Sequence, residues 1–271
     1  MYSPTNANYL LTDATLWPDA LNDLYRLEVP VKAVTLYTNT AFHALQLKGP
    51  ILVELGAERT LRDRWRYDIE LRKKATLLQS QATFTELATS LKRFINPGGR
   101  GLVRFADPLT AYFWLAGHHQ EVLDEVLPPI ERWWIGKPAH HWEPQPAWQV
   151  VTGGTGSGRD LVEFSLYEDA RLDAVHRWLW VENSYGFMRD YEPATAAQVT
   201  TAWLEQVFDS AVKFGLQTER HVAQWAVLHL GGRQPSFSSR ELQLLPPEAR
   251  VEKVFLEAIN LKMELEKKHG R

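Results

Sequence analysis

The sequence predicts an α+β / α/β protein with an N-terminal mixed α/β sheet lobe, a β-hairpin junction and a C-terminal helical lobe. Two observations predict this class. In the first half, short apolar runs alternate with segments of helical periodicity, which is typical of an α/β layer and not of a helix bundle or a β-sandwich. After about residue 168 the pattern is helical only. We therefore expect a lobe over 1–136, a linker and hairpin over 137–167, and a helical lobe over 168–271.

Short apolar runs predict the strands of the first half. Turn residues separate them; Gly49-Pro50 and Gly56, for example, enclose one such run. The predicted strands cover 9–12, 31–36, 51–55, 75–79 and 101–106. We expect them to form a sheet.

Capping signals place the helices between these strands. Thr83 followed by Glu86 is a capping box, because the Thr hydroxyl can accept from the third helical amide while the Glu side chain reaches back. Asp107 before Pro108 marks another start, since the carboxylate accepts from unpaired amides and proline needs no donor partner there. Further helices are predicted after Trp17-Pro18, over the charged stretch 58–74, and through Trp114 and Leu115.

The middle of the chain is rich in aromatic residues and proline. We interpret 128–146 as an irregular junction between the lobes. Two strands are then predicted at 148–152 and 161–166, and the glycine-rich segment 153–160 joins them as a hairpin or flexible loop.

The remaining sequence predicts a series of helices. The stretch 195–198 has a second capping-box pattern, Gly215 resembles a C-terminal cap, and Thr218 can start the next helix. Pro246-Pro247 begins a long amphipathic helix. Its apolar face consists of Val251, Val254, Phe255, Ala258, Leu261 and Leu265.

Composition excludes several classes of function. With 271 residues, 45% hydrophobic and 23% charged, the chain has the composition of a folded protein, and two lobes are expected for this length. A formal net charge of -3 provides no global field for nucleic acid or an anionic membrane. The absence of cysteine excludes disulfides, thiolate nucleophiles and zinc sites built on Cys. We see neither a secretory signal nor an apolar run of about 18 residues, so a cytoplasmic location is expected.

The glycine-rich loop is the one motif that suggests an enzyme. Gly153 and Gly158 have the spacing of a phosphate-binding loop, but Arg159-Asp160 replace the required lysine and hydroxyl residue. A strand is also predicted after the loop where a phosphate loop needs a helix. We favour a plain hairpin loop and keep a small-molecule or nucleotide-using enzyme as the alternative.

No other catalytic group is evident. The pairs His118-His119 and His140-His141 are unsuited to bidentate metal binding, because adjacent side chains point in different directions; one His from each pair with a nearby acid remains an open combination. The chain has no strand-to-helix nucleophile elbow. We therefore expect no enzyme activity, no catalytic, cofactor or metal residues and no cofactor, and interpret the chain as a binding protein.

Three motifs resemble a known family. They are YLLTDA at 9–14, GPILVEL at 49–55 and LVRFADP at 102–108, with the helical stretches 211–219 and 228–232 showing a looser likeness. In order and spacing they resemble a domain-of-unknown-function family of bacterial type VI secretion adaptors. These Tap or TEC chaperones load a toxic effector onto the VgrG spike. In the third motif Arg104, Asp107 and Pro108 match the family signature, and Ala106 stands where an aromatic is common.

The resemblance implies a cytoplasmic adaptor whose partners are a cognate secreted effector and VgrG, with no nucleic acid and no membrane. It carries over no catalytic residue, and we interpret Arg104, Asp107 and Pro108 as structural. Interfaces concentrate their energy in a few Trp, Tyr and Arg anchors, although single aromatics are more often core. Candidate partner-binding residues are Trp133, Trp134, Trp142, Trp178, Trp180, Tyr185 and Phe187. A toxin-neutralising immunity protein is a third possibility.

Overall fold

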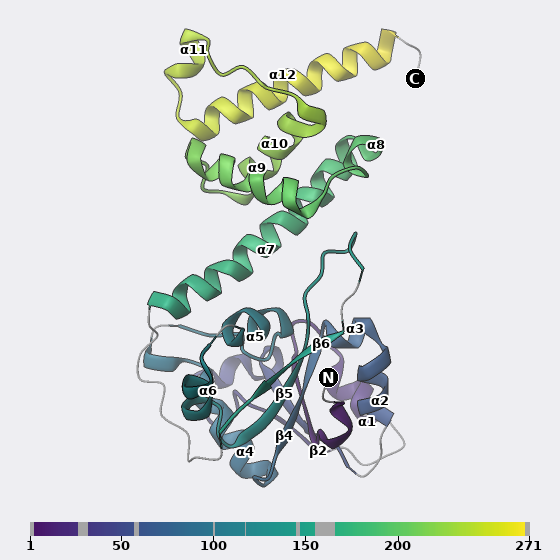
Figure 1. Cartoon of the computed structure of the whole chain (residues 1–271), viewed down its shortest axis with the longest axis vertical. Helices are drawn as coiled ribbons and strands as arrows, with labels where there is room; N and C mark the ends of the chain where they lie inside the picture. Colours follow the sequence, from purple (N-terminus) through teal and green to yellow (C-terminus); the bar gives the residue numbers. More distant parts are fainter. Residues whose placement is uncertain are drawn as a thin grey trace. The chain divides into compact units, whose positions relative to one another are not determined.

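The protein consists of two compact units, Met1–Val175 and His176–Arg271, which we call the N-terminal unit and the helical unit. The computed structural model in Figure 1 describes residues 3–26, 32–56, 60–99, 101–116, 118–144, 147–154 and 166–268. Within these residues, every helix is too short or too polar to cross a lipid bilayer. An N-terminal sheet and a C-terminal helical region confirm the predicted α+β class.

A six-stranded antiparallel sheet forms the centre of the N-terminal unit. Its order is β2-β3-β1-β4-β5-β6. The strands are β1 (Tyr9–Asp13), β2 (Lys32–Thr35), β3 (Pro50–Glu54), β4 (Ala75–Ser80), β5 (Ile130–Gly136) and β6 (Trp148–Thr152). The registers Leu11↔Leu52 and Leu11↔Thr76 place β1 between β3 and β4. The predicted strands at 9–12, 51–55, 75–79 and 148–152 are thereby confirmed, as is the strand predicted at 31–36 for residues 32–35, while residue 31 lies outside the described residues.

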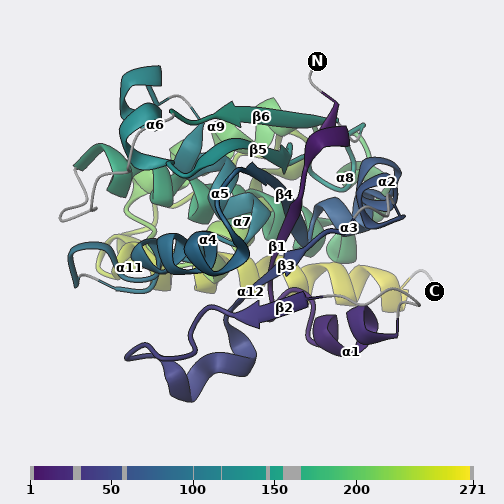
Figure 2. The same ribbon diagram turned by 90° about the horizontal axis from the view of Figure 1, so that it is seen from below.

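Helices cover both faces of this sheet, as Figure 2 shows. Alternate side chains point to opposite faces of a strand, so Leu10 and Leu11 enter two different cores. On the side of Leu10 lie α1 (Ala20–Tyr25), α2 (Thr60–Tyr67) and α3 (Ile69–Arg72). On the side of Leu11 lie α4 (Phe84–Leu91), α5 (Pro108–Leu115) and α6 (Gln120–Val126). Burial on both faces explains why the strand sequences are continuously apolar.

The capping predictions for this unit are confirmed. The Thr83 hydroxyl accepts from the amide of Glu86, and the Glu86 carboxylate accepts from the amide of Thr83 at 2.9 Å. Asp107 accepts from the amide of Leu109 at 2.9 Å, with Pro108 as the first residue of α5. The charged stretch 58–74 differs from the prediction, because Asp68 ends α2 and caps α3.

Two assignments in the N-terminal unit are wrong. Residues 101–106 do not form a strand; Val103 donates to the carbonyl of Ile95 at 2.9 Å, and the segment connects to α5 with Val103 and Phe105 buried. Within 128–146, residues Ile130–Gly136 are not an irregular junction but strand β5, which pairs with both β4 and β6. Strand β6 therefore belongs to the sheet and not to a linker. Most of its predicted hairpin partner, 161–165, lies outside the described residues.

The helical unit begins within α7 (Leu166–Tyr191). It continues with α8 (Pro193–Ala196), α9 (Thr201–Phe214), α10 (Glu219–His229), α11 (Arg240–Gln243) and α12 (Pro247–Lys268). Gly215 ends α9 with a φ of 96°, as predicted, in the left-handed region that favours glycine. The predicted capping box at 195–198 is wrong, because Thr200 caps α9 by accepting from the amide of Trp203. Short 3-10 turns occur at Pro4–Asn6, His43–Lys48, Lys92–Phe94, Pro97–Gly99 and Leu230–Gly232.

Candidate functional site

The three sequence motifs of the N-terminal unit meet at one end of the sheet. Asp13, the last residue of β1, pairs in register with Pro50, the first residue of β3. Arg104 donates from Nε to Asp13 Oδ2 at 3.1 Å and lies 3.6 Å from Asp107 Oδ2. Asp13 Oδ1 accepts from both the amide and the hydroxyl of Thr15. We call Asp13, Thr15, Arg104 and Asp107 the motif cluster.

The motif cluster holds two buried carboxylates against one guanidinium. Asp13 is 2% and Asp107 8% exposed, whereas the Arg104 side chain is 46% exposed. Burial raises the pKa of Asp107 above its usual value, while Arg104 and the Leu109 amide oppose the rise. Asp107 also caps α5, so the cluster joins β1 to the start of a core helix. These contacts give Asp13, Arg104 and Asp107 a role in holding the fold together.

The motif glycine has a packing role at the same end of the sheet. A Cβ on Gly49 would lie 2.4 Å from Cδ2 of the Tyr37 ring, so only glycine fits. The Gly49 carbonyl accepts from the amide of Ala14 at 3.1 Å. Tyr37 is buried, and this burial raises the pKa of its hydroxyl.

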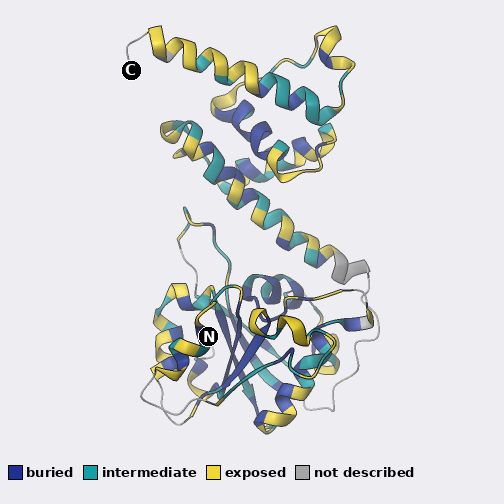
Figure 3. Ribbon diagram, turned by 180° about the vertical axis from the view of Figure 1, so that it is seen from behind, coloured by how far each residue is buried: buried dark blue, intermediate teal, exposed yellow. Residues whose placement is uncertain are grey.

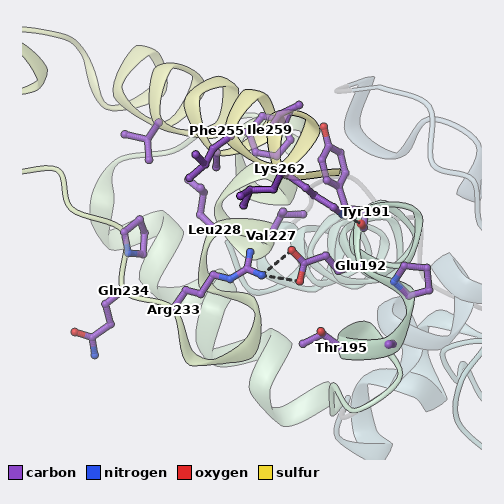
Figure 4. Close-up of a pocket in the computed structure, with 17 residues that line it drawn as sticks. Tyr191, Glu192, Thr195, Val227, Leu228, Arg233, Gln234, Phe255, Ile259 and Lys262 are labelled. Carbon is purple, nitrogen blue, oxygen red and sulfur yellow. Dashed lines mark hydrogen bonds and ion pairs between the residues drawn. The ribbon is translucent and has the colours of Figure 1, made fainter. Parts of the chain in front are cut away.

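A hollow in the helical unit has the chemistry of a binding surface. Its volume is about 800 Å³, and it is lined by 191–195, by Val227 and Leu228 of α10, by 233–235, and by one face of α12 (Figure 4). Most of the lining side chains are aliphatic or aromatic. We call it the helical groove. Apolar concave surfaces of this kind accept apolar side chains of a ligand or of a partner helix.

Polar contacts fix the rim of the helical groove. Arg233 Nη2 donates to both carboxylate oxygens of Glu192, at 2.7 and 2.8 Å (Figure 4). Lys262 of α12 donates to the carbonyl of Tyr191, the last residue of α7. The two contacts tie the 233–235 segment and α12 to the end of α7 and the start of α8.

Comparison with protein families identifies the region that contains the motif cluster. Residues 8–125 match the model of a family described as "Domain of unknown function (DUF4123)". The match covers less than half of the 271 residues and contains the three motifs at 9–14, 49–55 and 102–108. No curated protein and no solved structure matches the chain. The helical groove lies C-terminal to the DUF4123 match.

Two of the predicted partner-binding residues are core residues. Trp133 and Trp134 lie beyond the DUF4123 match in β5, and each is 0% exposed. Trp133 packs with the α4–α6 side of the sheet, and Trp134 with the α1–α3 side. Consecutive residues of a strand point to opposite faces, so the doubled aromatic serves both cores. Neither ring presents a surface to a partner, and we correct the expectation for both.

The other predicted anchors belong to different units, Trp142 to the N-terminal unit and the rest to the helical unit. Trp142 follows β5 and is half-buried, with its ring stacked 4.4 Å from that of His140. The other four, Trp178, Trp180, Tyr185 and Phe187, all belong to α7. Tyr185 is buried, whereas Phe187 is half-buried and contacts the rings of Tyr191 and Phe255, which line the helical groove. A role in partner binding for these five residues stays a prediction.

No motif in the sequence indicates the helical groove. The ion pair at its rim joins Glu192 and Arg233, which are 41 residues apart in the chain and belong to no motif. The available signal was the apolar stripe of α12, which continues to Leu265 and so extends beyond the part of the helix that its neighbours bury.

The first glycines of the predicted phosphate loop have structural roles. The Gly153 amide donates to the carbonyl of Glu131 at 3.0 Å, so it is not available to a phosphate. A Cβ on Gly154 would lie 2.7 Å from the carbonyl oxygen of Asp124. Residues 155–160 lie outside the described part of the chain.

Replacing Gly153 by Ala should lower the free energy of unfolding by about 2 kcal/mol. The new Cβ would lie 2.1 Å from the carbonyl oxygen of Ile130, a backbone atom that cannot rotate away. Urea unfolding of the full chain measures the change. Gly56→Ala is the matched control, because a Cβ there would have no described atom within 4 Å, and it should change stability by less than about 0.5 kcal/mol. Equal midpoints for the two variants would contradict the packing role.

Among the described residues, no group of three or more His, Asp or Glu side chains is arranged to hold a metal ion. The ring of His140 is buried and stacked on Trp142, and its backbone amide donates to Glu143 at 3.2 Å. His119 is exposed at the start of α6.

Proposed function

We propose that this protein is a cytoplasmic adaptor of a type VI secretion system, which binds a toxic effector and helps to load it onto the VgrG spike. The observation that carries the proposal is the DUF4123 match over 8–125, because that family is associated with type VI secretion effectors. On this proposal the chain acts by binding and not by catalysis, and it is not itself secreted.

The helical groove supports the proposal by supplying a surface for the effector. It combines an apolar lining with a rim held by ion pairing, whereas the two carboxylates of the motif cluster are buried and engaged with Arg104 and the start of α5. We therefore assign effector capture to the helical unit. The alternative, a phosphate-using enzyme, would need the Gly153 amide as a donor to phosphate, but this amide donates to the carbonyl of Glu131.

Co-expression tests the adaptor role. The tagged full chain is produced with the effector and the VgrG protein encoded nearest to its gene, and each pair and the trio are purified. We expect the effector to co-purify with the chain, and VgrG to retain the effector only when the chain is present.

Two outcomes would contradict the adaptor. A folded chain that retains neither protein would overturn it. A chain that binds the effector and abolishes its toxicity without increasing its retention on VgrG would instead indicate an immunity protein.

A further inference from the structure

The apolar stripe of α12 extends beyond the part of the helix that is buried. Val251 and Phe255, in the first half of the helix, are 0% and 5% exposed, whereas Leu261 and Leu265 are 60% and 48% exposed. Figure 3 shows α12 becoming mostly exposed toward the C-terminus. The apolar stripe nevertheless keeps one spacing along the whole helix, with alternating steps of three and four residues. Its members are Val251, Val254, Ala258, Leu261 and Leu265. That spacing is the seam of a coiled coil. The second half of α12 thus has the pattern of a packed helix without a described element covering Leu261 and Leu265.

The length and lining of the helical groove suit one helix. The stripe from Val254 to Leu265 spans about 17 Å at 1.5 Å per residue, or about three turns. Opposite α12, the groove is lined by Tyr191, Val227 and Leu228. A helix laid between these walls would bury apolar side chains on both sides, which is the helix-in-groove mode of recognition.

The charges beside the stripe define the partner. Glu257 and Glu264 are seven residues apart, both exposed, and flank the stripe on the side of Leu261. Neither forms an ion pair within the described residues. On the opposite flank, Lys262 is engaged with the carbonyl of Tyr191. Residues that flank an apolar stripe select partners by charge. The flank with Glu257 and Glu264 therefore favours a partner helix that carries lysine or arginine on the facing side.

A second copy of α12 is a poor occupant. In an antiparallel pair the flanks with Glu257 and Glu264 would face their equivalents and repel. In a parallel pair, Glu257 would face the partner's Lys262, which would have to leave the carbonyl of Tyr191.

We propose that the helical groove binds an amphipathic helix of the effector that carries lysine or arginine beside its apolar stripe. The inference rests on the proposed adaptor function for the identity of the partner. The recognition chemistry belongs to the groove and can be tested separately.

The first test uses two synthetic peptides of about 18 residues, long enough for about five helical turns. Both carry leucine in a heptad stripe; one has lysine at the flanking positions and the other glutamate. Fluorescence anisotropy with the full chain should show the lysine peptide binding about tenfold more tightly at low salt, with the difference shrinking as salt rises. Equal affinities, or no binding of the lysine peptide, would overturn the inference.

Variants connect this preference to the groove. The double substitution Glu257→Lys with Glu264→Lys should reverse the preference for the two peptides, and Leu261→Glu should weaken binding of both by about tenfold or more. All three residues are exposed, so the variants should fold. Leu256→Glu and Met263→Glu are matched controls, because these residues are 51% and 50% exposed and lie on the side of α12 opposite the apolar stripe, away from both the groove lining and the flank with Glu257 and Glu264. Reduced peptide binding in the controls would contradict the proposed site.

Co-purification with the effector separates this inference from the adaptor function. If the effector is retained by the wild-type chain and equally by Leu261→Glu, the groove is not the capture site although the adaptor role stands. If the wild-type chain retains neither effector nor VgrG, the adaptor role fails. A wild-type dimer that becomes monomeric in Leu261→Glu, measured by light scattering, would show that a second copy fills the groove and would overturn the inference.

Discussion

Replacing Trp133 by Ala should lower the free energy of unfolding of the N-terminal unit by about 3–5 kcal/mol, and Trp134→Ala should have an effect of similar size. Both side chains are 0% exposed, and each belongs to a different core of the same sheet. Because the two rings have separate surroundings, the losses should be roughly additive. Their sum approaches the whole stability of a typical domain, so the double variant should leave this unit unfolded.

A milder substitution refines the prediction for Trp133. Its Nε1 is buried without a hydrogen-bond partner among the described residues, so Trp133→Phe removes an unsatisfied donor along with part of the ring. We expect Trp133→Phe to cost about 1 kcal/mol, much less than Trp133→Ala. Leu47→Ala is the surface control, since Leu47 is 75% exposed.

Urea unfolding followed by circular dichroism gives these differences, with separate transitions fitted where two occur. A Trp133→Ala variant that unfolds at the wild-type midpoint but no longer captures the effector would contradict the core assignment. That result would return Trp133 to the interface.

Local sequence signals predicted the elements that depend on few neighbours. The capping box at Thr83 and Glu86, the start of α5 at Asp107 and the end of α9 at Gly215 each satisfy backbone groups within a few residues. The first four strands were found close to their true bounds because each is a short apolar run between turn residues, a signal that is local even though the strand partners are distant. The predicted capping box at 195–198 failed because two local signals compete there. Pro193–Ala196 forms its own short helix, and Thr200 caps α9 instead.

Assignments that depend on distant neighbours could not be made from the sequence. Trp133 and Trp134 stand near several prolines, and only the pairing of β5 with β4 and β6 shows that both faces of this strand are buried. The contact between Arg104 and Asp13 joins residues 91 positions apart. The helical groove likewise depends on which part of α12 its neighbours cover, and a helical periodicity does not contain that information.

Replacing Arg104 by Ala should lower the free energy of unfolding by about 3 kcal/mol at pH 7. The substitution would remove the cation that contacts Asp13 and Asp107 and leave two buried carboxylates close together. Because burial already raises the pKa of Asp107 in the folded protein, protonation of this group favours folding. Its stabilising effect is fully present below the unfolded pKa, about 3.9, and is lost as the pH rises through the raised folded value.

Arg104 lowers the pKa of Asp107, so its removal should raise the folded value further. The difference in stability between Arg104→Ala and the wild type should therefore be largest near pH 7 and should shrink as the pH falls toward 4. Arg104→Lys keeps a positive charge and should show a smaller loss with a weaker pH dependence. Arg26→Ala is the surface control, because the Arg26 side chain is 81% exposed and its pair with Asp23 is worth little.

Urea midpoints at pH 5 and pH 7 distinguish the structural role of the motif from a binding role. A loss of stability that is equal at both pH values would show that Arg104 is not coupled to protonation of Asp107. An Arg104→Lys variant that keeps wild-type stability yet fails to capture the effector would place the motif in the interface. We expect the opposite, namely effector capture that falls only as far as the folded fraction does, because Arg104 directs its contacts toward Asp13, Thr15 and Asp107.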